Sequence, residues 1–249
     1  MRYWLVMPAA GVGRRFGTAR PKQYASLQGR TVIEWALAPF LADSSCAGVV
    51  MGLATEDPYW GEVADRLAKL PGRVPQLICV TGGVERSHTV RKGLEALDGR
   101  AAPDDWVLVH DAARPCLSSV DLQRLLERLD GHSVGGLLAS PAADTLKRAS
   151  SNSTTNSTDN VEVEQTVDRA GLWRALTPQM FQYTTLYEAL DHAFATGRLP
   201  TDEAQAVEWT GKRPVLVQGS AANIKITSAD DLVLAAALLN ARESASVAR

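Results

Sequence analysis

The residue types most suited to chemistry stand near the start of the chain, where an apolar run breaks into glycines and then cations. The segment Pro8-Ala9-Ala10-Gly11-Val12-Gly13-Arg14-Arg15-Phe16-Gly17 is followed by Pro21-Lys22-Gln23. Small residues let backbone N–H groups approach a ligand closely, and the cations can neutralise phosphate charge. The spacing G-x-G-x-x-x-G does not match the P-loop motif. It also differs from the dinucleotide fingerprint G-x-G-x-x-G, which has one residue fewer between its second and third glycines. The segment therefore predicts binding of phosphates or a nucleotide through a different loop.

A second chemical signal is Asp111, which follows the apolar run Val107–Val109 and precedes Arg114. A carboxylate at the end of a strand is well placed to hold Mg²⁺, which uses one or two carboxylates together with substrate phosphates. Because successive residues of a strand point to opposite faces, we expect His110 to be a packed histidine rather than a metal ligand. The neighbouring cations favour Asp111 as a metal ligand over the alternative of a structural cap.

A third segment, Gly82–Val90, combines two glycines with a hydroxyl. Gly83 can expose backbone donors and acceptors to a base, and Thr89 offers a hydroxyl near the start of a helix. The alternative is a simple turn in which Ser87 or Thr89 caps the helix. Ser87 and His88 do not predict covalent catalysis, because a catalytic triad is assembled from separate segments and no G-x-S-x-G turn surrounds them.

Short apolar runs that alternate with helix-period segments must position these residues. Such alternation indicates βαβ units and a mainly parallel sheet with helices on both faces. Ligands of these sheets gather at the carboxyl ends of the strands, so the loops after Met7, Val80 and Val109 should form one site. The expected strands are Tyr3–Met7, Ala47–Leu53, Gln76–Val80, Trp106–Val109, Gly135–Ala139 and Pro214–Val217. The expected helices are Thr31–Ala42, Asp57–Lys69, Ser87–Leu97, Val120–Leu129, Thr185–Ala195, Glu203–Thr210 and Ala229–Arg242.

The chain is expected to form one domain over residues 1–242, with residues 143–169 projecting from it. Residues 150–160 are polar and of low complexity, so they cannot bury a core and predict a flexible tip. The alternating flanks Asp144–Arg148 and Val161–Arg169 predict an antiparallel hairpin. Residues 243–249 are expected to be a disordered tail.

Composition limits the partners and the compartment. With 26 Lys and Arg against 28 Asp and Glu, the net charge of −2 gives no general attraction to nucleic acid or to an anionic membrane. The 3 cysteines are dispersed, which is typical of reduced thiols in a cytosol. No apolar run reaches the ~20 residues of a membrane span, and no signal peptide is recognisable. We therefore expect a cytoplasmic protein with neither a nucleic-acid nor a membrane partner.

Together these segments resemble those of the 2-C-methyl-D-erythritol 4-phosphate cytidylyltransferases, from the first strand to Arg242. The resemblance implies a Rossmann-like nucleotidyltransferase fold and Mg²⁺-dependent transfer of a cytidylyl group from CTP to methylerythritol phosphate, with release of pyrophosphate. It makes residues 1–242 a nucleotidyltransferase domain in isoprenoid precursor biosynthesis. The segments that carry it are Pro8–Arg15, Pro21–Tyr24, His110–Pro115, Asp144–Lys147, Thr166–Arg169, Leu176–Gln179, Thr201–Glu203 and Asn223–Lys225.

The resemblance also implies roles on the nucleotide side. Arg15 and Lys22 would contact the triphosphate, Lys225 would lie near the α-phosphate, and these three would be catalytic. Asp111 would hold Mg²⁺ against the phosphate oxygens. Cytosine would be read by backbone groups and by the Thr89 hydroxyl. The implied nucleotide-binding set is Ala9, Ala10, Gly11, Gly13, Gly83, Thr89 and Asp111.

On the acceptor side the resemblance implies that Arg114 and Thr201 face the methylerythritol phosphate. By its local pattern alone, Thr201 would only belong to a helix N-cap. The hairpin would cross to a partner subunit, where Thr145 and Arg169 would reach the neighbour's substrate phosphate. The expected assembly is therefore a homodimer with exchanged arms.

Two departures and several alternatives accompany this prediction. Val84 stands where relatives often carry a polar residue, and the Ser/Thr/Asn insertion is longer than the usual arm tip. Some relatives are fused to a second enzyme domain, whereas this chain predicts the cytidylyltransferase activity alone.

The nearest alternative is a cytidylyltransferase acting on another polyol phosphate such as ribitol phosphate; another is a nucleotide-binding regulator without turnover. A Rossmann oxidoreductase is disfavoured by the glycine spacing and by the absence of an acidic residue at Leu53–Thr55.

Overall fold

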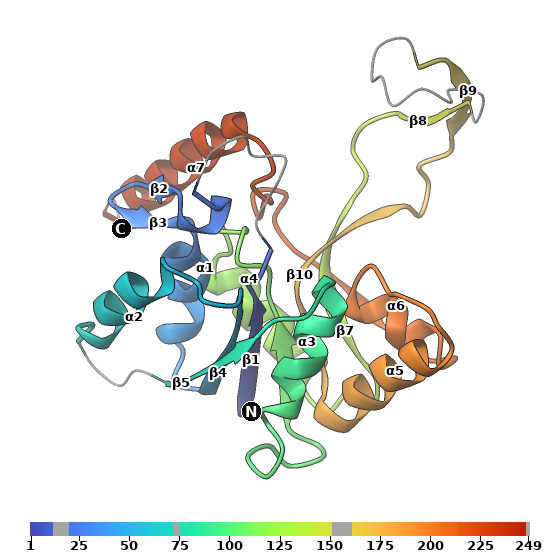
Figure 1. The fold of residues 1–249 in the computed structure, drawn as a ribbon. Helices are drawn as coiled ribbons and strands as arrows, with labels where there is room; N and C mark the ends of the chain where they lie inside the picture. Colours follow the sequence, from blue (N-terminus) through green and yellow to red (C-terminus); the bar gives the residue numbers. More distant parts are fainter. Residues whose placement is uncertain (12–19, 72–74, 151–160, 248–249) are drawn as a thin grey trace.

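A computed structural model describes residues 1–11, 20–71, 75–150 and 161–247 of the chain. A seven-stranded sheet forms its centre, with helices on both faces (Figure 1). The strands of this sheet are β1 (Tyr3–Pro8), β4 (Cys46–Leu53), β5 (Gln76–Thr81), β6 (Trp106–Val109), β7 (Gly135–Pro141), β10 (Trp173–Gln182) and β11 (Val215–Gln218). The helices are α1 (Val32–Leu41), α2 (Trp60–Ala68), α3 (Arg86–Glu95), α4 (Ser119–Leu129), α5 (Tyr183–Ala195), α6 (Glu203–Glu208) and α7 (Ala229–Val247). A 3-10 helix, η2 (Lys22–Tyr24), precedes the small strand pair β2 (Ser26–Leu27) and β3 (Arg30–Thr31).

The order of the strands in space is β11-β7-β10-β6-β1-β4-β5. β10 runs antiparallel to both of its neighbours, and the other adjacent pairs are parallel. The predicted mainly parallel α/β sheet is therefore confirmed. Because β1, β4, β5 and β6 point in one direction, the loops that follow them lie at the same edge of the sheet.

The apolar strands contribute to two cores because alternate side chains enter opposite layers. In β1, Leu5 and Met7 belong to the core under α1, α2 and α4, whereas Trp4 and Val6 belong to the core under α3, α5 and α6. All four side chains are buried. Burial on both faces explains why these strands are apolar throughout. A third, smaller core holds α7 against Leu27 and its surroundings.

Strand β10 was not among the predicted strands. Pro178 stands in its middle, and the pairing with β7 shifts register between Ala175 and Gln179. Proline cannot donate to a strand ladder, so a pattern that contains it argues against a central strand. Here β6 and β7 supply partners on both sides, and the tertiary contacts override the local signal.

The predicted hairpin is present as β8 (Leu146–Ala149) paired antiparallel with β9 (Val163–Val167). Lys147 stands opposite Thr166, and its Nζ donates a 2.7 Å hydrogen bond to the threonine hydroxyl. The hairpin projects well away from the central sheet (Figure 1). Of the predicted flexible tip, residues 151–160 lie outside the described part of the chain.

The C-terminal helix is longer than predicted. α7 continues to Val247, so residues 243–247, which we expected to be disordered, are helical. No glycine or proline follows Ala229 within the helix to stop it. Residues 248 and 249 lie outside the described residues. No helix in the described ranges is long and apolar enough to cross a membrane.

Candidate functional site

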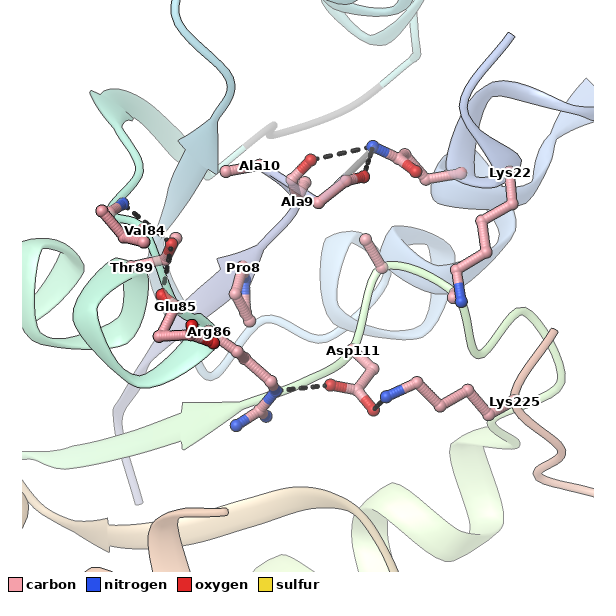
Figure 2. A pocket seen from close by; sticks show the side chains of 15 residues that line it. Pro8, Ala9, Ala10, Lys22, Val84, Glu85, Arg86, Thr89, Asp111 and Lys225 are labelled. Atoms are coloured by element: carbon pink, nitrogen blue, oxygen red, sulfur yellow. Dashed lines mark hydrogen bonds and ion pairs between the residues drawn. The ribbon is translucent and has the colours of Figure 1, made fainter. Parts of the chain in front are cut away.

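The loops that follow β1, β5 and β6 meet around a pocket of about 250 Å³ (Figure 2). The sequence predicted that the loops at the carboxyl ends of these three strands would form one site. Lys22 and Lys225 enter the same pocket from η2 and from the loop after β11. The lining residues are Pro8, Ala9, Ala10, Gly11, Lys22, Gln23, Gly83, Val84, Glu85, Arg86, Thr89, Asp111, Ala112, Ala113 and Lys225.

The first two loops approach each other closely at Gly82. A Cβ atom placed there would lie 2.3 Å from the Cβ of Ala10 and 3.0 Å from Oγ1 of Thr89. The backbone N–H of Gly83 donates a 3.0 Å hydrogen bond to the Thr89 hydroxyl, which itself donates to the carbonyl of Glu85 at 3.3 Å. Both hydrogen-bonding directions of the hydroxyl are thus engaged with the loop backbone. Thr89 orders the loop that exposes the backbone of Gly83.

Gln23 fixes the loop after β1 from the other side. Its buried side-chain amide donates to the carbonyl oxygens of Ala9, at 2.8 Å, and of Gly11, at 3.1 Å. These bonds keep the small residues at the end of β1 in a defined conformation, with their backbone facing the pocket. Gln23 was part of the family resemblance but was not predicted as a site residue.

Asp111 lies on the floor of the pocket and is surrounded by cations. Its Oδ2 lies 2.9 Å from Nζ of Lys225 and 3.4 Å from Nε of Arg114, and its Oδ1 lies 2.9 Å from Nε of Arg86. The residue is only 7% exposed. Burial alone would raise the pKa of the carboxyl, but Arg86, Lys225 and Arg114 together hold that pKa well below its usual range. Asp111 is therefore an ionised carboxylate at neutral pH.

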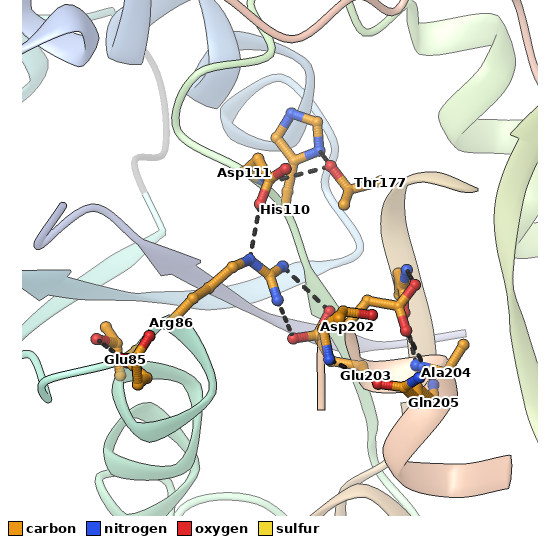
Figure 3. A network of polar contacts seen from close by, with 12 residues as sticks. Glu85, Arg86, His110, Asp111, Thr177, Asp202, Glu203, Ala204 and Gln205 are labelled. Carbon is orange, nitrogen blue, oxygen red and sulfur yellow. Dashed lines mark hydrogen bonds and ion pairs between the residues drawn. The ribbon is translucent and has the colours of Figure 1, made fainter. Parts of the chain in front are cut away.

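Arg86 joins Asp111 to a second buried carboxylate, Glu203 (Figure 3). Nη1 and Nη2 of Arg86 donate to the two carboxylate oxygens of Glu203 at 2.6 and 3.1 Å. Burial raises the pKa of Glu203, and the charge of Arg86 opposes that rise. Neither Arg86 nor Glu203 was predicted as a site residue, because a helix-start arginine and an acidic N-terminal residue look ordinary when taken separately.

His110 is a packed residue, as predicted. Its ring is fully buried, with Nδ1 2.9 Å from Oγ1 of Thr177 and Nε2 3.2 Å from the carbonyl oxygen of Arg114. Since Oγ1 of Thr177 accepts from the backbone N–H of Asp111 at 3.2 Å, its hydroxyl can donate to Nδ1. Burial lowers the pKa of His110 to about 4, so the ring is neutral at pH 7. The histidine thus holds the ends of β6 and β10 together.

The loop that carries Lys225 is tied to the same centre. Arg114 donates through Nη1 to the carbonyl oxygen of Asn223 at 2.8 Å, and the Asn223 side chain donates to the carbonyl oxygen of Thr177 at 2.7 Å. Lys225 therefore reaches Asp111 from a loop that is itself hydrogen-bonded to the β6 and β10 segments.

The structure brings together most of the predicted nucleotide-side residues. Arg114 contacts Asp111 without lining the pocket, and Thr201 lies exposed just before α6. Thr145 and Arg169 lie exposed on the arm rather than at the pocket. Gly13 and Arg15 lie outside the described residues. Val84 stands at the rim of the pocket and is 94% exposed, so its side chain has little to contact within the chain.

A metal ion in this pocket would take its ligands partly from the protein and partly from the substrate. Among the described residues, no group of three or more His, Cys, Asp or Glu side chains could hold an ion by itself. Mg²⁺ commonly takes one or two carboxylates and completes its shell with substrate phosphates and water. An ionised Asp111 at the floor of a pocket lined by lysines fits this mode of binding.

Comparison of the sequence with known proteins finds similarity to one family of enzymes. The family model "IspD: 2-C-methyl-D-erythritol 4-phosphate cytidylyltransferase" matches residues 3–241. The protein of that name from Halorhodospira halophila is 50% identical over 247 residues, covering 98% of this chain and 97% of its own. The one from Vibrio vulnificus is 44% identical over 230 residues, covering 92% of this chain and 91% of its own.

Solved structures of enzymes with the same activity have a fold similar to that of this chain. A crystal structure of a 4-diphosphocytidyl-2C-methyl-D-erythritol synthase superposes with a TM-score of 0.79 at 38% identity, covering 96% of this chain and 100% of that one. The 2-C-methyl-D-erythritol 4-phosphate cytidylyltransferase of Thermus thermophilus superposes with a TM-score of 0.72 at 31% identity, with the same coverage.

Proposed function

The chain belongs to the 2-C-methyl-D-erythritol 4-phosphate cytidylyltransferase family, and we propose that the pocket around Asp111 is where it performs the reaction of that family. The enzyme transfers a cytidylyl group from CTP to 2-C-methyl-D-erythritol 4-phosphate and releases pyrophosphate in isoprenoid precursor biosynthesis. The observation that supports the assignment of the site is the convergence of Lys22, Lys225 and Arg86 on one carboxylate-bearing pocket.

The chemistry requires charge stabilisation rather than proton abstraction. The acceptor phosphate is already ionised at neutral pH, so it can attack the α-phosphorus of CTP without a general base. The difficulty is that one anion approaches another and that negative charge builds up on the transferring group. Preorganised cations in a partly buried site stabilise that charge. Lys225 is proposed to serve the α-phosphate, and Lys22 with Arg15 the β- and γ-phosphate oxygens, which leave as pyrophosphate.

The small residues at the strand ends are proposed to select the base. Ala9, Ala10 and Gly83 present backbone groups at one wall of the pocket, and Thr89 orders that wall. A site lined by small residues and fixed donors and acceptors disfavours purines by size and separates cytosine from uracil by hydrogen bonding.

Mg²⁺ is proposed as the cofactor, held by Asp111 and the phosphates of CTP. When bound, the ion would neutralise phosphate charge and orient the oxygens of the nucleotide. In the structure Lys225 Nζ lies 2.9 Å from Asp111 Oδ2, so the carboxylate also keeps that lysine at the pocket floor. The flexible stem of a lysine allows its charge to turn from the carboxylate towards a bound phosphate.

The acceptor is proposed to bind between Arg114, Thr201 and the arm of a partner subunit. The arm and its base expose large apolar side chains, which is unusual for a surface that stays in water. These side chains are Leu146, Val161, Val163, Leu172 and Trp173. A homodimer with exchanged arms would cover them and bring Thr145 and Arg169 to the neighbour's acceptor phosphate. The cysteines Cys46, Cys79 and Cys116 form no disulfide in the structure, which supports the proposal of a reducing, cytoplasmic location.

The activity is tested by incubating the folded protein with CTP, Mg²⁺ and 2-C-methyl-D-erythritol 4-phosphate and measuring pyrophosphate. We expect release that depends on all three components and much higher kcat/KM with this acceptor than with ribitol phosphate. CTP binding without pyrophosphate release would instead indicate a regulator that retains the fold. Higher kcat/KM with ribitol phosphate would reassign the acceptor.

A further inference from the structure

The buried residue Arg86 connects the two halves of the site. It is the first residue of α3, on the nucleotide side of the pocket, and its guanidinium contacts both Asp111 and Glu203 (Figure 3). We propose that Arg86 is a positioning residue that couples the nucleotide side of the site to the acceptor side through these two carboxylates. This inference rests on the proposed function of the site.

The geometry makes the connection rigid. All three guanidinium nitrogens are used: Nε donates to Asp111 at 2.9 Å, and Nη1 and Nη2 donate to Glu203 at 2.6 and 3.1 Å. Because the guanidinium is planar, the two carboxylates must keep a fixed relative orientation to retain these bonds. A displacement at one carboxylate is therefore transmitted to the other.

At the acceptor end, Glu203 is the first residue of α6 and is 1% exposed. The preceding Asp202 caps the helix by accepting from the backbone N–H of Gln205 at 2.9 Å. Gln205 in turn accepts from the backbone N–H of Thr201 at 2.8 Å. The position of Thr201 thus depends on the start of α6, which Arg86 holds through Glu203.

Apart from Arg86, one further side chain anchors the start of α6 among the described contacts, and it comes from the sheet. Gln179 of β10 donates to Asp202 at 3.0 Å and accepts from the backbone N–H of Ala204 at 2.7 Å. That anchor fixes the helix to β10, whereas Arg86 fixes it to the nucleotide pocket. Only the connection through Arg86 links the nucleotide side of the proposed site to its acceptor side.

At the nucleotide end, Arg86 differs from the other cations around Asp111. Lys225 is proposed to serve a phosphate, and Arg114 is proposed to serve the acceptor. The guanidinium of Arg86 is bonded to Asp111 on one side and to Glu203 on the other, so each of its nitrogens has a carboxylate partner within the protein. It therefore orients the carboxylate without needing to touch either substrate.

The simplest alternative is that Arg86 only neutralises the buried charge of Glu203. Removing one partner of such a pair leaves an uncompensated buried charge and destabilises the protein, so a loss of activity in a single variant would be ambiguous. The double variant Arg86→Gln/Glu203→Gln removes both charges together and leaves two amides that can hydrogen-bond to each other. It separates the neutralising role from the positioning role.

The experiment measures kcat and the KM values for both substrates, together with Tm. We expect Arg86→Lys to lower kcat roughly 10- to 100-fold and to raise both KM values, because a lysine cannot hold two carboxylates in one plane. Glu203→Gln should raise the KM of the acceptor most and should also raise that of CTP, because Arg86 loses its ionic partner at Glu203 and shifts the Asp111 carboxylate. An unchanged KM for CTP in folded Glu203→Gln would contradict the coupling. The double variant should fold and keep a low kcat.

Arg91→Lys is the matched control, since Arg91 lies on the same helix, does not line the pocket, and pairs with the exposed carboxylates of Asp191 and Glu95. Its kinetics should equal those of the wild type. Recovery of the double variant to within about twofold of wild-type kcat/KM would overturn the proposal, as would unchanged kinetics in folded Arg86→Lys. Failure of the wild-type protein itself to release pyrophosphate would refute the function of the site rather than this coupling.

Discussion

Nζ of Lys22 donates a 2.8 Å hydrogen bond to the backbone carbonyl of Ile226, a residue 204 positions further along the chain. Lys22 belongs to η2, just after the glycine-rich segment, and Ile226 follows Lys225 in the loop after β11. The bond brings the two lysines of the pocket, which come from opposite ends of the sequence, to one side of the Asp111 carboxylate (Figure 2).

Replacing Lys225 by alanine should chiefly lower kcat. An interaction that strengthens as charge builds up in the transition state contributes to kcat more than to KM, and loss of one such donor costs roughly 10²- to 10³-fold. Lys22→Ala should act in the same direction. Steady-state pyrophosphate release is the measurement, and Lys69→Ala, at an exposed lysine after α2, is the control. An unchanged kcat in both site variants would remove the two lysines from the catalytic set.

Gly82→Ala should weaken the binding of CTP. The added methyl group would lie 2.3 Å from the Cβ of Ala10, so the loops after β1 and β5 would have to separate. We expect the KM for CTP to rise roughly tenfold or more while the protein stays folded. The control is Gly61→Ala in α2, where a Cβ would meet nothing within 4 Å. Equal CTP affinity in the two variants would show that the close approach does not shape the base pocket.

The stability of the fold should decrease between neutral and mildly acidic pH because of His110. Burial lowers the pKa of this ring to about 4, whereas an unfolded histidine titrates near ~6.5. Between these values the unfolded chain binds a proton that the folded protein does not, so the contribution is complete above ~6.5 and is lost as the pH falls towards 4. From pH 7 to pH 5 this amounts to roughly 2 kcal/mol.

The measurement is urea unfolding of the wild type and of His110→Gln at pH 7 and pH 5. The variant should be less stable at pH 7 and should lose less stability on acidification than the wild type. His192→Gln, at an exposed histidine of α5, is the matched control. An identical loss in His110→Gln and in the wild type would contradict the assignment of this pH dependence to His110.

Exchange of arms between subunits should be detectable by mixing two inactive variants. Asp111→Asn disables the body of a site, and Arg169→Ala disables the arm. If each site combines the body of one subunit with the arm of the other, a mixed dimer contains one intact site. Co-refolding equal amounts should then restore about a quarter of wild-type activity. Activity no higher than the sum of the two variants alone would show that sites are built within one chain, and light scattering would report the oligomeric state.

The local pattern of the sequence was enough to predict much of the frame. The apolar runs over Tyr3–Met7 and Trp106–Val109 predicted strands that the structure contains, and the breaks after them predicted a shared pocket. The alternation of side chains along a strand is a local property, and a continuously apolar run indicates a strand that is covered on both faces, so both can be recognised in the sequence. The same reasoning identified Asp111 and treated His110 as a packed residue.

Only the tertiary structure decided the features that depend on the path of the chain. Pro178 hid β10, and the contacts with β6 and β7 that make it a strand come from distant segments. Arg86 and Glu203 are separated by 117 positions, and no local pattern marks either one. A buried charge is tolerated only where an opposite charge meets it, and that meeting is a property of the folded chain. The sequence determined which groups could bind phosphate; the fold decided which carboxylates and cations act on one another.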